Sequence, residues 1–116
     1  MYEEILEKIG LNKGEAKIYE TLLREGSLPV ISISKKTGLT RTNTYNHLYS
    51  LAKKGLVESR TRKKKNYFYP NSPENLRILF EQKKKTEEMA ERELNNILPS
   101  LVSTFLASSN RPSISY

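Results

Sequence analysis

The chain has 116 residues, no cysteine, one histidine and a formal net charge of +7. This length suits one small domain with an appendage, and the composition excludes a disulfide framework and a thiolate metal site, so we expect no metal and no cofactor. No stretch reaches the ~18 consecutive apolar residues of a membrane span and the N-terminus lacks a signal-peptide pattern, so we expect a cytoplasmic protein without a membrane partner.

The positive charge is concentrated in the middle of the chain. Residues 35–73 contain ten Lys or Arg and one acid, Glu58. By contrast, residues 1–34 contain four bases and six acids, and residues 74–116 contain six of each. Such a dense basic segment is typical of a nucleic-acid surface, although a basic surface can also be merely solvated.

The N-terminal third predicts three helices and a short strand. Asn12 followed by Glu15 fits a capping box at the start of the second helix, and glycine ends the first two helices at Gly10 and Gly26. Pro29 suits the first turn of the third helix, where its missing N–H would be unpaired anyway. The expected elements are, in order, a helix over 2–9, a helix over 13–25, a strand at 27–28 and a helix over 29–37.

Residues 38–54 predict a tight turn followed by an amphipathic helix. Gly38 can adopt the left-handed conformation that leaves the previous helix, and Thr40 is a good N-cap for a helix over 41–54. With Leu48 at the centre of the buried side, a rotation of about 100° per residue leaves an exposed face with no acid. That face comprises Thr42, Asn43, Asn46, Ser50 and Lys53.

A basic two-stranded hairpin is expected directly after this helix. Gly55 ends the helix, and the pattern predicts a strand over 56–62, a loop over 63–66 and a strand over 67–69. Alternation of side chains leads us to expect Tyr67 and Tyr69 to face the core. This order of turn, helix, glycine and hairpin is that of a winged helix-turn-helix.

Several side chains of this motif suit contact with DNA. Asn43 and Asn46 can pair with adenine edges, and Thr42 can meet a thymine methyl group or a phosphate, unless these residues only solvate the helix. We expect Lys53 and Lys54 to reach phosphates. The candidate DNA-binding residues are Lys35, Lys36, Arg41, Thr42, Asn43, Asn46, Ser50, Lys53, Arg60, Arg62, Lys63, Lys64 and Lys65.

A long C-terminal helix follows the hairpin and is expected to form a homodimer. Ser72 and Pro73 make a helix start, and apolar residues recur in a heptad pattern that is weak in the middle and strong over 90–105. Pro99 is expected to kink or restart this helix. The helix either folds back on its own domain or pairs with its twin, and we favour the homodimer. The candidate dimerisation residues are Leu76, Phe80, Ala90, Leu94, Ile97, Leu101 and Phe105.

These patterns predict a mainly α fold with a small β-wing, a winged helix-turn-helix followed by a long dimerisation helix. The expected divisions are a DNA-binding domain over 1–71, the long helix over 72–107, and a linker or truncated start of a further domain over 108–116. No Ser/His/Asp set, paired-carboxylate pocket or phosphate-cradling glycine loop is present in the sequence, so we expect no enzymatic activity.

The sequence resembles the TrmB family, mostly archaeal transcription regulators that often respond to sugars. The resemblance rests on EEILEKIGLNKGEAKIYETLLREG at 3–26, SKKTGLTRTNTYNHLYSLAKKGLVE at 34–58 and NNILPSL at 95–101. It implies that Thr42, Asn43 and Asn46 lie on the recognition helix, that residues 63–65 lie in the wing, and that residues 74–105 form the dimerising helix. Relatives commonly continue into an effector-binding domain. The segment RPSISY at 111–116 looks like its first strand, cut short, so we expect no small-molecule effector on this chain.

Together, these observations predict a sequence-specific regulator of transcription that binds double-stranded DNA as a homodimer and acts as a repressor. The alternative is a winged-helix module that binds proteins in a transcription-related complex without specific DNA reading.

Overall fold

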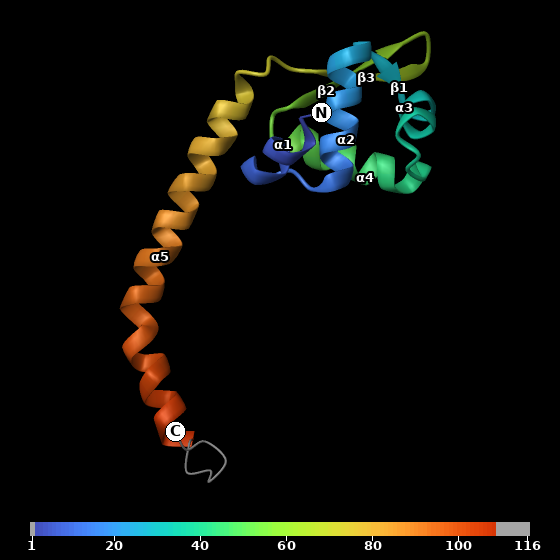
Figure 1. Ribbon diagram of the computed structural model, residues 1–116. Helices are drawn as coiled ribbons and strands as arrows, with labels where there is room; N and C mark the ends of the chain where they lie inside the picture. The colour runs from blue at the N-terminus through green and yellow to red at the C-terminus, as the bar shows by residue number, and fades with distance from the viewer. Residues whose placement is uncertain (1, 109–116) are drawn as a thin grey trace. The chain divides into compact units, whose positions relative to one another are not determined.

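The computed structural model describes residues 2–108, which contain five helices and one three-stranded sheet. This is the mainly helical architecture with a small wing that the sequence predicts (Figure 1). The chain divides into two compact units, residues 1–83 and residues 84–116. The elements are α1 (Glu3–Ile9), α2 (Lys13–Glu25), β1 (Leu28–Pro29), α3 (Val30–Thr37), α4 (Arg41–Lys53), β2 (Val57–Arg62), β3 (Lys65–Pro70) and α5 (Asn75–Ser108). The segment predicted to begin a further domain, 111–116, lies outside the described residues.

Local capping fixes where α2 and α4 begin. The Asn12 side chain accepts the Glu15 backbone N–H at 2.8 Å, and the Glu15 carboxylate accepts the Asn12 N–H at 2.8 Å, which is the predicted capping box. The Thr40 hydroxyl accepts the Asn43 N–H at 3.2 Å at the start of α4. Between α3 and α4, Gly38 has φ of 77°, the left-handed conformation that glycine adopts without strain.

Helix α2 lies at the centre of the hydrophobic core. It packs against α1, α3, α4 and β3. Tyr19, Leu22, Ile33, Leu48 and Leu51 are completely or almost completely buried, and together they join α2, α3 and α4. Each such side chain contributes about 1.5–3 kcal/mol by leaving water, so this contact of three helices is the main support of the position of α4.

One detail of the first unit differs from the sequence-based expectation. Pro29 does not occupy the first turn of α3, since it pairs with Tyr67 in β1 and then serves as the N-cap of the helix. On α2, Ile18 is buried in the core and Leu23 is more than a third exposed.

The sheet has the order β1-β3-β2, with all strands antiparallel. Arg62 pairs directly with Lys65, so the hairpin turn consists of Lys63 and Lys64 alone, with φ of 51° and 64°. The predicted four-residue loop is therefore too long, and Lys65 and Asn66 belong to β3. Positive φ at both turn residues is the signature of a type I′ turn, which matches the twist of the strands. The turn could not be recognised from the sequence because lysines occupy the two positions where Asn-Gly is usual.

The expectation that Tyr67 and Tyr69 face the core is wrong. Phe68 is the buried residue of β3, whereas both tyrosines are half-buried. Val57 pairs with Pro70 and Ser59 with Phe68, so the core-facing side of β2 meets the even-numbered residues of β3. Because side chains alternate strictly along a strand, Tyr67 and Tyr69 lie on the opposite face.

Helix α5 runs unbroken from Asn75 to Ser108, with Pro99 inside it, so the predicted restart at Pro99 does not occur. A proline removes one backbone hydrogen bond, and on an exposed helix the freed carbonyl group remains accessible to water. The first turn of α5 belongs to the core, because Leu76 and Leu79 are partly buried against it. Leu76, expected in the dimerisation helix, is therefore occupied within its own domain.

Candidate nucleic-acid interface

The turn between α3 and α4 is held by short hydrogen bonds from three hydroxyl groups. The Ser34 hydroxyl donates to the Leu39 carbonyl at 2.6 Å, and the Thr37 hydroxyl donates to the Ile33 carbonyl at 2.7 Å. The Thr44 hydroxyl donates to the Thr40 carbonyl at 2.7 Å. Leu39 is half-buried against the core. These contacts fix the direction in which α4 leaves the turn.

Helix α4 presents a polar side to solvent. Its buried residues are Thr44, Leu48 and Leu51. The predicted readers Thr42, Asn43 and Asn46 are exposed, as is Lys53 at the end of the helix. Because the apolar side of α4 lies in the core and its exposed side carries short polar side chains, the helix can approach a flat or grooved partner closely.

Tyr49 also belongs to the exposed side of α4, and the sequence-based prediction missed it. It is 63% exposed and lies on the same side as Thr42, Asn46 and Lys53, at spacings of three and four residues. Its ring stacks on that of Tyr45, with centroids 6.4 Å apart. The signal was available, since Tyr49 is about 100° from Leu48 around the helix and so lies beyond the edge of the buried face.

The start of α4 and the turn of the hairpin form one concave surface, which we call the α4–wing surface. Its volume is about 420 Å³. It brings Arg41 together with the adjacent lysines Lys64 and Lys65, and its lining contains no carboxylate. The lining residues are Pro29, Val30, Ile31, Arg41, Tyr45, Lys64, Lys65 and Asn66. An uncompensated cluster of cations around a concavity attracts anions.

Two residues near the end of α4, Ser50 and Lys54, point toward α2 and not toward the solvent-exposed side of the helix. The Lys54 ammonium donates to both carboxylate oxygens of Glu15, at 2.8 and 2.9 Å, and to the Gly10 carbonyl at 3.2 Å. Lys54 is therefore not free to reach a phosphate, contrary to expectation. Ser50 is half-buried and hydrogen-bonds the same carboxylate, which turns it toward α2 and away from the exposed side to which it was assigned.

This ion pair fastens the end of α4 to the start of α2. Glu15 is 1% exposed, and burial alone would raise the pKa of its carboxyl group. Hydrogen bonds from Lys54, Ser50 and the Asn12 backbone, together with the charge of Lys54, outweigh burial and hold the pKa below its ordinary value of 4.5. Glu15 thus stays ionised and keeps Lys54 in place.

Helices α2 and α4 also approach closely at Gly14. A β-carbon on Gly14 would overlap the imidazole ring of His47, which is half-buried against it. The single histidine is therefore a packing residue between the two helices. Like the Glu15–Lys54 pair, this contact fixes the position of α4 relative to the core.

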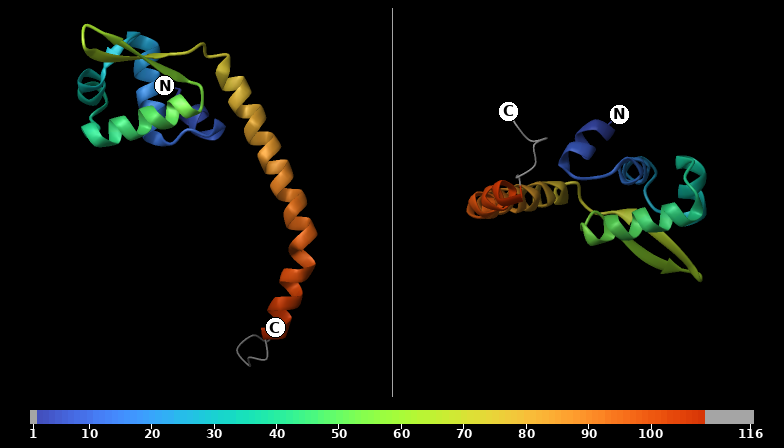
Figure 2. Two further views of the ribbon diagram at one scale, coloured as in Figure 1. Left: turned by 180° about the vertical axis from the view of Figure 1, so that it is seen from behind. Right: turned by 90° about the horizontal axis from the view of Figure 1, so that it is seen from below.

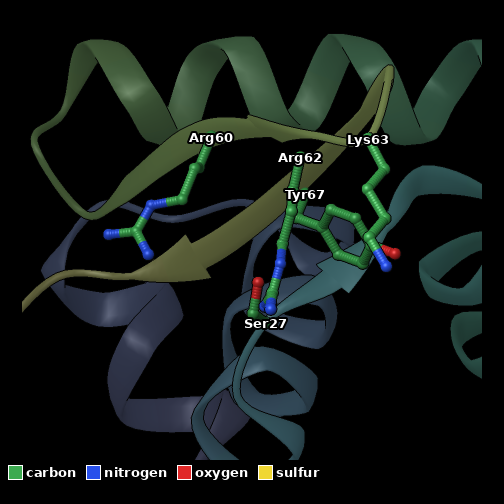
Figure 3. Close-up of a pocket in the computed structure, with 5 residues that line it drawn as sticks. All are labelled: Ser27, Arg60, Arg62, Lys63 and Tyr67. Carbon is green, nitrogen blue, oxygen red and sulfur yellow. The ribbon is translucent and has the colours of Figure 1, made fainter.

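The remaining predicted basic residues lie on different surfaces. Lys35 and Lys36 are exposed in the last turn of α3, and the Lys36 ammonium lies 3.6 Å from the Glu25 carboxylate. Arg60 and Arg62 extend from the side of the sheet that faces away from the core (Figure 3). Figure 2 shows the turn end of the β2–β3 hairpin projecting beyond the helices, and residues 58–66 are exposed.

Other kinds of site are not seen in the described part of the chain. Residues 2–108 contain no group of three or more His, Cys, Asp or Glu that could hold a metal ion. None of the helices in this range is long and apolar enough to cross a membrane.

Comparison with known proteins gives a family match. The family model described as "Sugar-specific transcriptional regulator TrmB" matches residues 6–74. The HTH-type sugar sensing transcriptional regulator TrmBL1 of Pyrococcus furiosus is 42% identical over 59 residues, which cover 48% of this chain and 17% of that protein.

Solved structures with a similar fold include two DNA-related winged-helix proteins. The structure of TrmBL2, described as an archaeal chromatin protein, has a TM-score of 0.69 and 25% identity and covers 99% of this chain and 44% of that chain. The homodimeric winged helix-turn-helix DNA-binding domain Mb0332 from Mycobacterium bovis has a TM-score of 0.53 and 25% identity, and the match covers 73% of this chain and 78% of that chain. This chain thus spans less than half the length of TrmBL1 or TrmBL2.

Proposed function

Since this chain belongs to the TrmB family of transcriptional regulators, which are not enzymes, we propose that it reads double-stranded DNA sequence-specifically as a homodimer and acts as a repressor. The observation that carries the proposal is the α4–wing surface, where Arg41, Lys64 and Lys65 surround a concavity beside the exposed side of α4. The protein then occupies an operator and excludes the polymerase from it. This activity takes place in the cytoplasm.

The dimensions and chemistry of α4 suit the major groove. That groove is about 12 Å wide and admits one helix, whose short polar side chains meet the base edges. Asn43 and Asn46 have the paired donor and acceptor that adenine presents, and Thr42 can contact a thymine methyl group or a phosphate. Tyr49, exposed on the same side, contacts sugar or base at the edge of this footprint.

The cations around α4 supply the non-specific part of the affinity. Arg41 at the start of the helix and Lys64 and Lys65 at the wing line one concavity, so a single stretch of backbone reaches all three. Lys53 contacts the phosphates at the other end of the helix. Each phosphate neutralised releases counterions, which makes binding weaker as salt rises.

The apolar side of α5 supports the homodimer. Leu94, Ile97, Leu101 and Phe105 are each about half exposed, and they follow one another at spacings of three and four residues. A single helix cannot cover such a stripe, whereas a second copy can, by the pairing typical of coiled coils. The Mycobacterium bovis neighbour is itself described as homodimeric. Two recognition helices would then contact half-sites roughly 34–36 Å apart.

The salt dependence of duplex binding tests this proposal. We expect the wild-type chain to bind pooled genomic fragments at low salt, with a steep loss of affinity as salt rises. In the variant R41Q/K64Q/K65Q, the magnitude of the log–log salt slope should fall by about 0.9 for each phosphate that is no longer neutralised. The matched control K8Q/K13Q/K17Q removes three exposed charges from α1 and α2 and should keep the wild-type slope.

Absence of a duplex shift at low salt would overturn DNA binding and favour a protein-binding winged helix. Base reading is tested separately with Asn43→Ala, which should cost about 1–3 kcal/mol on the preferred sequence if the contact is bidentate. The same variant should have little effect on random DNA. Equal losses on preferred and random duplexes would show that Asn43 does not read bases.

A further inference from the structure

The sheet has a second basic surface, separate from the α4–wing surface. The pairing of Arg60 with Tyr67 and the alternation along β2 place both side chains on the face opposite Phe68. Phe68 is buried in the core and Arg60 is exposed, so this face is directed away from α2, α3 and α4. We call it the outer face, and it comprises Glu58, Arg60, Arg62, Lys65, Tyr67 and Tyr69.

A cavity of about 390 Å³ lies on the outer face and is lined by Ser27, Arg60, Arg62, Lys63 and Tyr67. Figure 3 shows the Arg62 side chain running across the face to Ser27, while the Lys63 side chain extends toward the Tyr67 hydroxyl. The lining therefore offers two guanidinium groups, one ammonium group and two hydroxyl groups, and no carboxylate. Guanidinium groups match the geometry of phosphate oxygens, to which they donate paired hydrogen bonds.

No carboxylate among the described residues forms an ion pair with a cation of this cavity. In the range 2–108, neither Arg62 nor Lys63 forms an ion pair. The Arg60 guanidinium lies 5.2 Å from the centre of the Tyr69 ring. Glu58, the acid of the outer face, instead accepts a hydrogen bond from the Tyr69 hydroxyl at 3.4 Å. Three like charges held around one concavity are stabilised when an anion binds among them.

A duplex that lies along α4 does not account for this second surface. Arg41 and Lys64 line the concavity between α3, α4 and the hairpin, and Lys65, which pairs with Arg62 at the end of the hairpin, also borders it. Arg60 and Tyr67 project from the opposite side of the sheet. The outer face therefore remains open to another anion after α4 has entered a groove.

We propose that the outer face is a second phosphate-binding site, which holds the backbone of a DNA segment other than the one contacted by α4. One winged-helix unit then bridges two duplex segments. This inference rests on the proposed function, because it takes α4 and the α4–wing surface to hold the first segment. A polyanion suits the site better than a small phosphate ester does, because the basic surface continues around the hairpin through Lys63 and Lys64.

The test compares binding of one duplex with capture of a second. The full 116-residue chain is bound to a short immobilised duplex, and retention of a labelled duplex added afterwards is measured. In parallel, fluorescence anisotropy gives the affinity for a single short duplex. The variants are R60Q/R62Q on the outer face and K64Q/K65Q at the α4–wing surface. The matched control is K84Q/K85Q, which removes two exposed charges from α5.

We expect R60Q/R62Q to bind a single duplex within about twofold of wild type, since its contacts around α4 are unchanged. Its capture of the second duplex should fall by at least about tenfold, because two guanidinium groups no longer donate to phosphate. R60K/R62K should restore part of the capture. K64Q/K65Q should lose both activities, and K84Q/K85Q should retain both.

Each other result has a distinct meaning. Wild-type chain that binds one duplex but captures no second duplex would overturn the bridging site and leave the proposed function intact. Capture that survives in R60Q/R62Q would also overturn it, because bridging would then come from two recognition helices of a dimer. An equal fall of single-duplex affinity in R60Q/R62Q and K64Q/K65Q would assign Arg60 and Arg62 to the first segment and refute a separate site. Wild-type chain that binds no duplex at all would contradict the proposed function itself.

Discussion

Replacing Lys54 with methionine should destabilise the domain strongly. The substitution keeps an unbranched apolar chain of four heavy atoms but removes the ammonium group that donates to Glu15 at 2.8 and 2.9 Å and to the Gly10 carbonyl at 3.2 Å. Glu15 is 1% exposed, so its carboxylate would remain in the core without a counter-charge. A buried charge left in this way is far more costly than a broken surface pair.

The expected loss follows from the burial of the two partners. Breaking a fully buried ion pair on one side costs about 3–5 kcal/mol. The Lys54 side chain is 26% exposed, and Glu15 keeps its hydrogen bonds from the Asn12 backbone and Ser50. We therefore expect the lower end, about 3 kcal/mol, which is a large share of the usual stability of a small domain. For a domain of this size the melting temperature should fall by about 12–24 °C.

Urea unfolding monitored by circular dichroism, at one fixed protein concentration, measures this loss. Lys53→Met is the matched control, since it removes the same charge from the exposed neighbour and should change stability by less than about 0.5 kcal/mol. The double variant E15Q/K54M should be more stable than the sum of the single changes predicts, because the glutamine side chain carries no charge that needs a partner. A loss below about 1 kcal/mol in K54M, the range of exposed pairs, would refute a structural role for this pair.

Three other properties of the chain can be tested by pH, by helix packing and by association. The Glu15 pKa is held below 4.5 in the folded protein, so the stabilisation by ionised Glu15 is present above pH 4.5 and is lost as the pH falls through the folded pKa. The difference in free energy of unfolding between wild type and K54M should therefore narrow in urea titrations below pH 4.5, and a constant difference would contradict this. Gly14→Ala should stabilise the domain by about 0.5–1 kcal/mol in the His47→Ala background, where alanine favours the helix and no imidazole ring overlaps its β-carbon. In the wild-type background that overlap should remove the gain, so equal effects of Gly14→Ala in the two backgrounds, measured by thermal melts, would disprove the contact. L94E/L101E should convert a dimer to a monomer in sedimentation. The control N96E/S103E changes two residues with the same spacing of seven on the opposite side of α5 and should leave the dimer intact, whereas a dimer that survives L94E/L101E would show that α5 does not form the interface.

Helix starts and ends could be predicted from the sequence because they depend on neighbouring residues. The Asn12 capping box, the Thr40 N-cap and the left-handed Gly38 each involve contacts within a few residues, and the structure shows all three. Most of the exposed side of α4 followed from the helical period in the same way, except that Tyr49 was missed and Ser50 is half-buried. Recognition of the family from the motifs at 3–26 and 34–58 is confirmed by the match over residues 6–74.

Features that depend on distant partners could not be predicted. Lys54 resembled any lysine at the end of a basic helix, and only the fold brings it to Glu15, which lies 39 residues earlier. Lysine at both left-handed positions gave no sign of a two-residue hairpin turn. The faces of β3 were misassigned because Tyr67, Phe68 and Tyr69 are all aromatic, so the alternation along the strand did not show which of them enters the core.

Selection of binding sites from a random-duplex pool tests the central claim most directly. Two copies of α4 related by twofold symmetry should enrich sequences with two inverted half-sites whose centres lie about 10–10.5 base pairs apart, or a multiple of that spacing. Loss of preference at one or two positions of each half-site in Asn43→Ala would locate the reading face of α4. A pool that shows no enriched sequence, or half-sites without symmetry, would contradict a homodimer that reads DNA through α4.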